Sequence, residues 1–243
     1  MTNVNYKILY CVLGCMIGPA LGGYFIGRAI EHFKSNDRVV IVKGLSEKEV
    51  KSDLAIWTIN YKNSENDLSL LDKKMALDKE ALETFLLQAG FNKDEISAGC
   101  TEIVDKASRE YSSSGDDRTA RYIMTGKTTL RTAQVDSVLP AQEKISQLIQ
   151  RGVIVSGSPS FYYTKLLDVR PQMIAEATKN ARHSATQFAD DSGCKVGSIR
   201  TANQGVFSIS AKDSLISDSN YSDLSSIDKK IRVVSTITFS LEQ

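Results

Sequence analysis

The longest hydrophobic run of the chain lies near its beginning. Residues 8–27, ILYCVLGCMIGPALGGYFIG, contain no charged side chain, and Lys7 and Arg28 stand at its two ends. A helix of that length reaches roughly 30 Å, which matches the hydrocarbon core of a bilayer. We therefore expect a transmembrane helix at about residues 8–30, within an N-terminal membrane anchor of residues 1–34 that a polar linker, residues 35–37, joins to the rest.

A cleaved leader is the alternative interpretation of this run. A secretory signal has a shorter apolar core and ends in a small-x-small exit. Gly18-Pro19-Ala20 is a poor exit, and the apolar run continues past it. Cys15 follows Val12-Leu13-Gly14 in the manner of a lipoprotein site, but most of the apolar residues come after that cysteine. The pattern favours an uncleaved anchor.

Glycines recur every fourth residue within the run, at Gly14, Gly18 and Gly22. This spacing places them on one helix face and allows a second helix backbone to approach closely. Small residues are also common in membrane helices for other reasons. We take these three glycines as the candidate site of helix association.

Beyond the linker the first hydrophobic segments have the pattern of strands. Residues 38–43, RVVIVK, are β-branched and predict a buried strand ended by Gly44. Residues 54–62 place alternate apolar side chains on one face and predict a second strand, antiparallel to the first. Trp57, the single tryptophan, is expected to anchor the core of that strand.

Three main helices follow from the 3.6-residue period of apolar positions. The first runs from a cap at Asn66-Asp67 to Ala89, the second from Asp136 or Ser137 to Gly152, and the third from Pro171, in its first turn, to Gly193. Their apolar stripes are Leu71, Met75, Leu82, Phe85, Leu86 and Ala89; Val138, Ile145, Leu148 and Ile149; and Ile174, Ala177, Ala181, Ala185, Phe188 and Ala189. The small residues of the third stripe would let that helix lie close to a sheet.

The remaining segments alternate between strands and loops. The final segment has the clearest strand pattern, because Ile231, Val233, Ile237, Phe239 and Leu241 face one way and polar residues face the other. Single helices between strand pairs indicate an α+β fold with antiparallel sheets. The other predicted strands are residues 96–106, 118–132, 153–155, 160–165 and 198–211, and the predicted loops are residues 112–117 and 212–228.

Composition narrows the function classes. With 30 basic and 29 acidic residues the chain is close to neutral, so it lacks the basic footprint of a nucleic-acid-binding protein. The segment of residues 38–243 is long enough for one large domain or two small lobes.

No catalytic, cofactor-binding or metal-binding motif is visible. Gly126-Lys127-Thr128 resembles the end of a phosphate-binding loop, but that motif requires a glycine where Arg121 stands. His183 has no carboxylate or cysteine at ligand spacing. Cys100 and Cys194 are the thiols outside the apolar run; two separate thiols are the expectation, and a disulfide is the alternative.

Three stretches together resemble the SIMPL-domain family, which includes the YggE-type bacterial cell-envelope proteins. They are the strand of residues 38–43 with Ser46-Glu47 and the strand Asp53-Leu54-Ala55-Ile56-Trp57; the alanine-rich helix that leads through Gly193 to a strand from Val196; and the closing strand of residues 231–241. The resemblance covers residues 38–243.

The resemblance implies an α+β domain exported to the periplasm or cell envelope, without known catalytic residues. It further implies ring-forming or channel-like oligomers in some members and a link to oxidative-stress tolerance. It would place the soluble part outside the inner membrane, although the basic residues after the apolar run weakly favour the opposite orientation.

Three hypotheses for the function follow. The first is a non-enzymatic, single-pass inner-membrane protein that forms homo-oligomers and bears a periplasmic domain. The second is a monomeric binding module for a small ligand or a partner protein. The third is an enzyme, for which Cys100, Cys194 and His183 are the only candidates.

Overall fold

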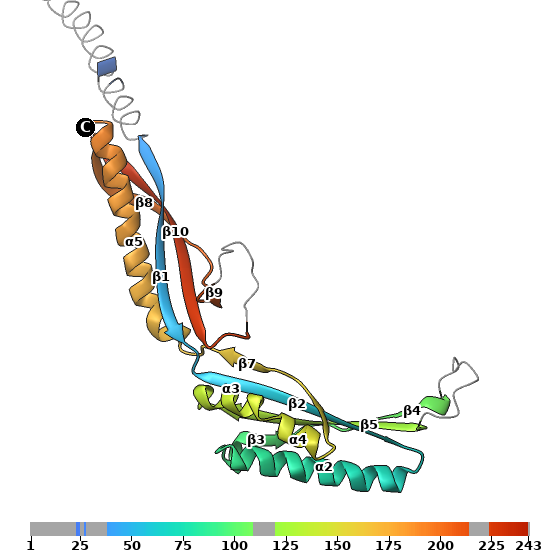
Figure 1. Cartoon of the computed structure of the whole chain (residues 1–243). Coiled ribbons are helices and arrows are strands. Elements are labelled where there is room, and N and C mark those ends of the chain that lie inside the picture. Colours follow the sequence, from blue (N-terminus) through green and yellow to red (C-terminus); the bar gives the residue numbers. More distant parts are fainter. Residues whose placement is uncertain (1–22, 25–26, 28–37, 109–119, 214–223, 243) are drawn as a thin grey trace, which may run out of the picture. The chain divides into compact units, whose positions relative to one another are not determined.

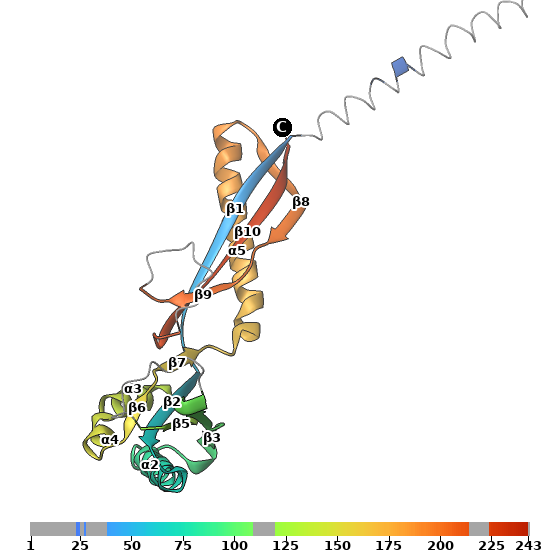
Figure 2. The same ribbon diagram turned by 90° about the vertical axis from the view of Figure 1, so that its right-hand side faces the viewer.

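The structure is a computed structural model that describes residues 23–24, 27, 38–108, 120–213 and 224–242 (Figures 1 and 2). Most of the predicted transmembrane segment, including Gly14, Gly18 and Gly22, lies outside these residues, as does the predicted loop of residues 112–117. No helix within the described ranges is both long enough and apolar enough to cross a membrane.

The chain divides into two compact units. Unit 1 consists of residues 1–46, 172–206 and 233–243, and unit 2 consists of residues 47–171 and 207–232. Antiparallel sheets with helices packed on them make up the described chain, as the α+β prediction requires.

The sheet of unit 1 has β10 (Asp228–Glu242) between β1 (Val39–Lys51) and β8 (Lys195–Gln204). The first residues of β10 belong to unit 2, where β9 (Ser208–Ala211) pairs with them. Helix α5 (Leu166–Asp191) lies against one face of this sheet (Figure 2). The predicted alternation of β10 is confirmed, because Ile231, Val233, Ile237 and Phe239 are buried.

The backbone of α5 contacts β1 directly at Gly44. A Cβ atom at Gly44 would lie 1.8 Å from the carbonyl oxygen of Ala177 and 2.7 Å from the backbone nitrogen of Ala181. The helix presents alanines here, and Ala177, Ala181 and Ala185 are fully buried. The close approach expected from the small residues is therefore confirmed. The prediction that Gly44 ends the strand is wrong, because this glycine admits the helix and β1 continues to Lys51.

Two other predictions for α5 are wrong. The helix begins at Leu166, so Pro171 lies inside it and not in its first turn. Phe188 is 63% exposed and does not belong to the buried stripe, whose place at this level is taken by Ala185 and Ala189.

The sheet of unit 2 has the order β3-β5-β2-β6, and all its strand pairs are antiparallel. Strand β4 also pairs with β5, and β7 also pairs with β2. The strands are β2 (Leu54–Glu65), β3 (Ile96–Ala98), β4 (Glu102–Asp105), β5 (Tyr122–Thr132), β6 (Ile154–Ser156) and β7 (Pro159–Tyr162). The predicted strand of residues 96–106 is thus two strands, separated at Gly99, whose N–H donates to the carbonyl of Lys127.

The predicted antiparallel pairing of the first two strands is wrong. β1 pairs with β10, whereas β2 is flanked by β5 on one side and by β6 and β7 on the other. Since both edges of β2 are occupied, β1 has no place beside it.

The helices of unit 2 cover one face of its sheet. α2 (Leu68–Gln88) begins at the cap Asp67, whose side chain accepts hydrogen bonds from the N–H groups of Ser69 and Leu70, as predicted. The second predicted helix is divided into α3 (Val135–Glu143) and α4 (Ser146–Gln150), and Ile149 is exposed and not part of the core. Trp57 is fully buried, and its Nε1–H donates to the carbonyl of Gly157 at 3.3 Å.

Replacement of Gly44 tests the contact between helix and strand. Gly44→Ala puts a methyl group into the backbone of α5, and overpacking of this kind costs about 1–3 kcal/mol in the free energy of unfolding. At about 2–4 °C per kcal/mol, we expect the midpoint of thermal unfolding to fall by several degrees. Circular dichroism of Lys43→Ala, at the exposed neighbouring position, gives the control. An unchanged midpoint for Gly44→Ala would contradict the close approach.

Candidate interaction surface

Strand β1 is an edge of the sheet in unit 1. Its direction relative to β10 follows from two contacts: Leu241 N–H donates to Arg38 O at 2.9 Å, and Arg232 Nε lies 3.6 Å from Glu47 Oε1. The two contacts are equally far apart on both strands (38 to 47 and 232 to 241), so the strands are antiparallel and in regular register between them. Alternate residues of β1 therefore face α5 or the opposite side.

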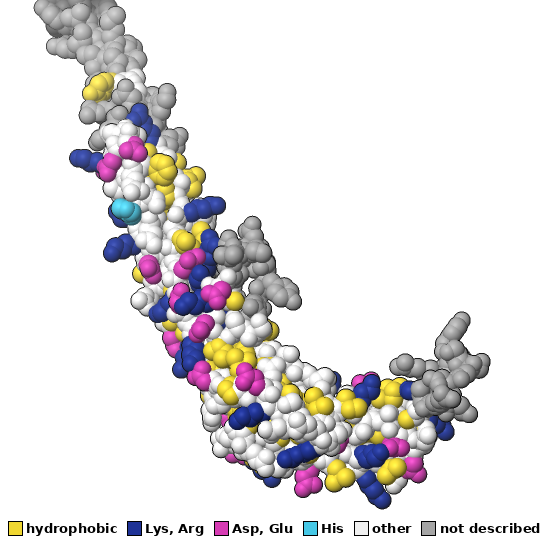
Figure 3. Space-filling model, viewed as in Figure 1, with side chains coloured by type: hydrophobic (Ala, Val, Ile, Leu, Met, Phe, Trp, Pro, Cys, Tyr) yellow, Lys and Arg dark blue, Asp and Glu magenta, His cyan; other side chains and the backbone are white. Residues whose placement is uncertain are grey.

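The side of this sheet away from α5 exposes apolar side chains. Val42 faces α5 and is buried, whereas Val39, Ile41 and Leu45 on the other side of β1 are exposed, Ile41 to 66%. Figure 3 shows hydrophobic side chains at the surface of this unit, between charged ones. We call Val39, Ile41 and Leu45 the outer patch.

The sequence analysis missed the outer patch. The prediction that residues 38–43 form a buried strand holds for one face only, because the single helix α5 covers one side of the sheet. A run of apolar residues at consecutive strand positions predicts burial on both faces. Exposed apolar side chains in such a run are typical of interaction surfaces.

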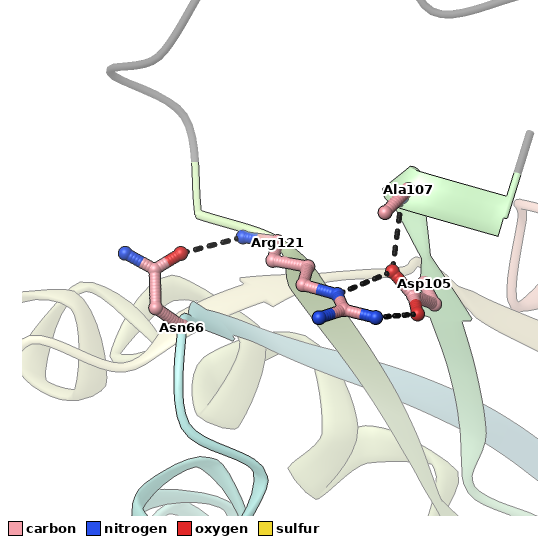
Figure 4. Close-up of polar contacts among 4 residues, drawn as sticks. All are labelled: Asn66, Asp105, Ala107 and Arg121. Carbon is pink, nitrogen blue, oxygen red and sulfur yellow. Dashed lines mark hydrogen bonds and ion pairs between the residues drawn. The ribbon is translucent and has the colours of Figure 1, made fainter.

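A second cluster joins β4 to β5 at the ends of residues 109–119 (Figure 4). The guanidinium of Arg121 donates to Asp105 through Nε at 3.1 Å and Nη2 at 2.9 Å, and the N–H of Ala107 donates to the same carboxylate at 2.9 Å. The N–H of Arg121 donates to Asn66 Oδ1 at 2.8 Å. The hydrogen bond from Arg121 lowers the pKa of Asp105. This arrangement holds a hairpin in place and presents no reactive group.

A third group of polar side chains lies between β2 and α2. Asn63 Nδ2 donates to Asp78, and Lys74 forms an ion pair with Glu65. Burial raises the pKa of Asp78, and it also raises the pKa of Tyr61. These groups satisfy one another at a contact between helix and sheet, so they serve the packing of unit 2.

The candidate chemical residues are dispersed. Cys100 is exposed in unit 2, Cys194 is partly buried in unit 1, and both are free thiols. His183 is exposed on α5. Within the described ranges, no three His, Cys, Asp or Glu side chains come together in a way that could hold a metal ion.

The rejected phosphate-loop fragment lies in a strand. Gly126, Lys127 and Thr128 belong to β5, and a Cβ atom at Gly126 would lie 2.3 Å from the ring of Tyr61. The glycine therefore makes room for the buried Tyr61. The segment is a strand, as predicted, and not the strand-to-helix turn of a phosphate-binding loop.

The SIMPL family model, described as a protein of unknown function (DUF541), matches residues 40–239. The match spans both units and most of the chain, and the chain belongs to this family. Comparison with curated proteins finds no match.

The pKa of Asp105 predicts how pH affects the hairpin contact. Because the folded-state pKa is lowered, the stabilisation is complete above the ordinary aspartate value of about 3.9 and is lost as the pH falls through the lowered pKa. We expect Arg121→Gln to lower the thermal midpoint slightly at pH 7 and to lower it less near pH 2. Lys106→Gln is the control: the backbone N–H of Lys106 donates to the carbonyl of Arg121 and is kept, while its side chain makes no bond to Asp105 or Arg121 among the described residues. An equal effect of Arg121→Gln at both pH values would show that its charge is irrelevant.

Proposed function

We propose that this SIMPL-family protein is a non-enzymatic, membrane-anchored cell-envelope protein that forms homo-oligomers. Its anchor is the uncharged run of residues 8–27, and its folded part lies on the periplasmic side of the inner membrane. The resemblance to envelope proteins supports the location, and the family supports the SIMPL type of domain. The same resemblance is the basis for proposing a role in stress tolerance.

The observation that carries the proposal is the outer patch in the unit next to the anchor. Ten residues, 28–37, separate the uncharged run from Arg38. Fully extended, they reach at most about 35 Å, so anchored copies would hold their unit 1 near the same membrane surface. Confinement of this kind raises the effective concentration of the exposed apolar side chains of neighbouring copies. The glycines Gly14, Gly18 and Gly22 offer a further contact within the membrane.

The dispersion of the reactive side chains supports a non-enzymatic role. Cys100 belongs to a different unit from Cys194 and His183. Nucleophilic catalysis requires a nucleophile and a base within hydrogen-bonding reach. Among the described residues, no hydrogen bond joins any two of these three side chains.

The mass of the full chain in detergent, measured by light scattering after size exclusion, tests self-association. We expect a defined oligomer, and we expect membrane fractionation to recover the protein in the inner membrane. Replacing Gly14, Gly18 and Gly22 together by Leu measures how much the anchor contributes to self-association. Gly23→Leu, which lies off the helix face of these three glycines, is the control. A monomeric full chain would remove the proposal of an oligomer.

A monomeric binding module is a second candidate, favoured by the free face of the sheet in unit 2. Lys62, Lys127 and Arg131 lie at strand positions that face away from α2. None of the three forms an ion pair within the described part of the chain. Hydroxyl side chains surround them at Thr58, Thr125, Thr129, Ser97 and Ser156. Three unpaired cations on such a face favour an acidic ligand.

Dextran sulfate is a suitable probe for this second function. If the face binds anions, the polymer raises the thermal midpoint of the full chain in a saturable manner, and Lys62→Gln with Lys127→Gln weakens that shift several-fold. Lys73→Gln with Lys79→Gln, on helix α2, removes the same charge elsewhere in unit 2. Equal shifts for both double variants would rule out this face as the binding site.

A further inference from the structure

We propose that copies of this chain associate head to tail, with the β1 edge of one copy pairing in parallel with the β8 edge of the next. The inference rests on the proposed self-association and identifies the surfaces that meet. It is distinct from association of the anchors through their glycines.

Both outer strands of the sheet in unit 1 have one open side. β10 lies between β1 and β8, so each of these two strands is hydrogen-bonded on one side only within the described residues. β1 has 13 residues and no proline. An edge strand presents a row of N–H and C=O groups that another strand can use, unless charges, proline or bulges protect it. The exposed residues in the first half of β1 are Val39, Ile41 and Leu45 with Lys43 between them, whereas the second half exposes Glu47, Glu49 and Lys51. The first half is therefore the less protected part of the edge.

The direction of the strands suits copies anchored in one membrane. β1 and β8 are both antiparallel to β10, so they are parallel to each other. Copies anchored by the same segment in one membrane share one orientation, and side-by-side placement then sets β1 of one copy parallel to β8 of the next. An antiparallel pair of two β1 strands would instead require one copy to be inverted.

The faces of the sheet favour β8 over β1 as the neighbour. Counting from the contact between Arg38 and Leu241, Lys43 lies opposite Thr236, which pairs with Asn203 on β8. Lys43 and Asn203 are therefore at the same level of the sheet, and they would meet between copies at that level. The open edges of two β1 strands that run in the same direction could meet only after a half-turn about that direction, which would set the two α5 helices on opposite faces of the joined sheet. Pairing of β1 with β8 keeps the helices of both copies on one face.

The side of the sheet that faces α5 also favours β1 of one copy beside β8 of the next. α5 covers β1 and β10, where Ala177 meets Gly44 and the guanidinium of Arg182 lies 5.2 Å from the ring centre of Phe239. Ile199 on β8 pairs with Phe239 and so faces the same side, yet it is 42% exposed. With β1 of the next copy beside β8, the α5 helix of that copy would cover Ile199.

Cysteine pairs test the contact in the full chain. All four native cysteines, Cys11, Cys15, Cys100 and Cys194, are first replaced by Ser, and Lys43→Cys and Asn203→Cys are then introduced together and singly. Within one copy β10 separates the two positions by about 9.6 Å, too far for a disulfide, whereas adjacent paired strands lie about 4.8 Å apart. A mild oxidant should therefore link the double variant between copies into dimers, trimers and longer products, and neither single variant should be linked.

The outcomes separate this inference from the proposed function. A linked dimer of the Lys43→Cys single variant would show that the faces of two β1 strands away from α5 lie against each other, and it would overturn the inference. A second cysteine pair, Ile41→Cys with Thr201→Cys, tests the next matched positions along the same two strands. If the wild type is oligomeric but neither double variant is linked, the copies associate through another surface, the anchor or lipid. A monomeric wild type would remove the proposed self-association itself. Circular dichroism of each variant verifies folding.

A backbone variant gives an independent readout. Residues of β1 with odd numbers direct their N–H groups away from β10, because Arg38 accepts from β10. Ile41→Pro removes one of these outward donors, which an edge strand tolerates. We expect it to abolish the oligomer that remains when Gly14, Gly18 and Gly22 are replaced. The control is Leu77→Lys, because Leu77 in unit 2 is as exposed as Ile41 but lies in a helix, where proline would break the structure. We expect Leu77→Lys to leave the mass of the oligomer unchanged.

Discussion

The approach of helix α5 to Gly44 determines how unit 1 is built. With a backbone oxygen of the helix 1.8 Å from the place of a Cβ atom, no other residue fits without movement of the helix. The alanines of α5 allow this distance along several turns, and Ala177, Ala181, Ala185 and Ala189 are buried. One side of β1 and β10 is consequently buried, while β8 and the far side of β1 remain accessible.

Much of this arrangement could be predicted from periodicity. The stripe of α2, its cap at Asp67, the burial of Trp57 and the alternation of β10 are all local patterns that a single element expresses by itself. The resemblance to the SIMPL family, which the family match bears out, rests on the order of those elements. Such local patterns predict the structure correctly because they do not depend on which strand becomes the neighbour.

Pairing and boundaries could not be predicted for a physical reason. A glycine in a strand can end it or admit another backbone, and the sequence around Gly44 does not distinguish the two. Strand partners depend on edges occupied by segments far away, which is why β1 pairs with a strand almost two hundred residues later and not with β2. The open edge and the outer patch likewise became visible only once the position of α5 was known. The candidate association site of Gly14, Gly18 and Gly22 lies outside the described residues and stays a prediction.

The order of the segments along the chain has a consequence for synthesis. Unit 2 is complete once residue 232 has been made, whereas unit 1 combines residues from the beginning, the middle and the last eleven positions, 233–243. Its central strand, β10, is synthesised after all the other described elements. Until then β1 and β8 have no common partner, and α5 has an incomplete sheet beneath it. A growing chain therefore completes unit 2 only about eleven residues before it completes unit 1, and until β10 is made β1 has no partner that protects its edges from other strands.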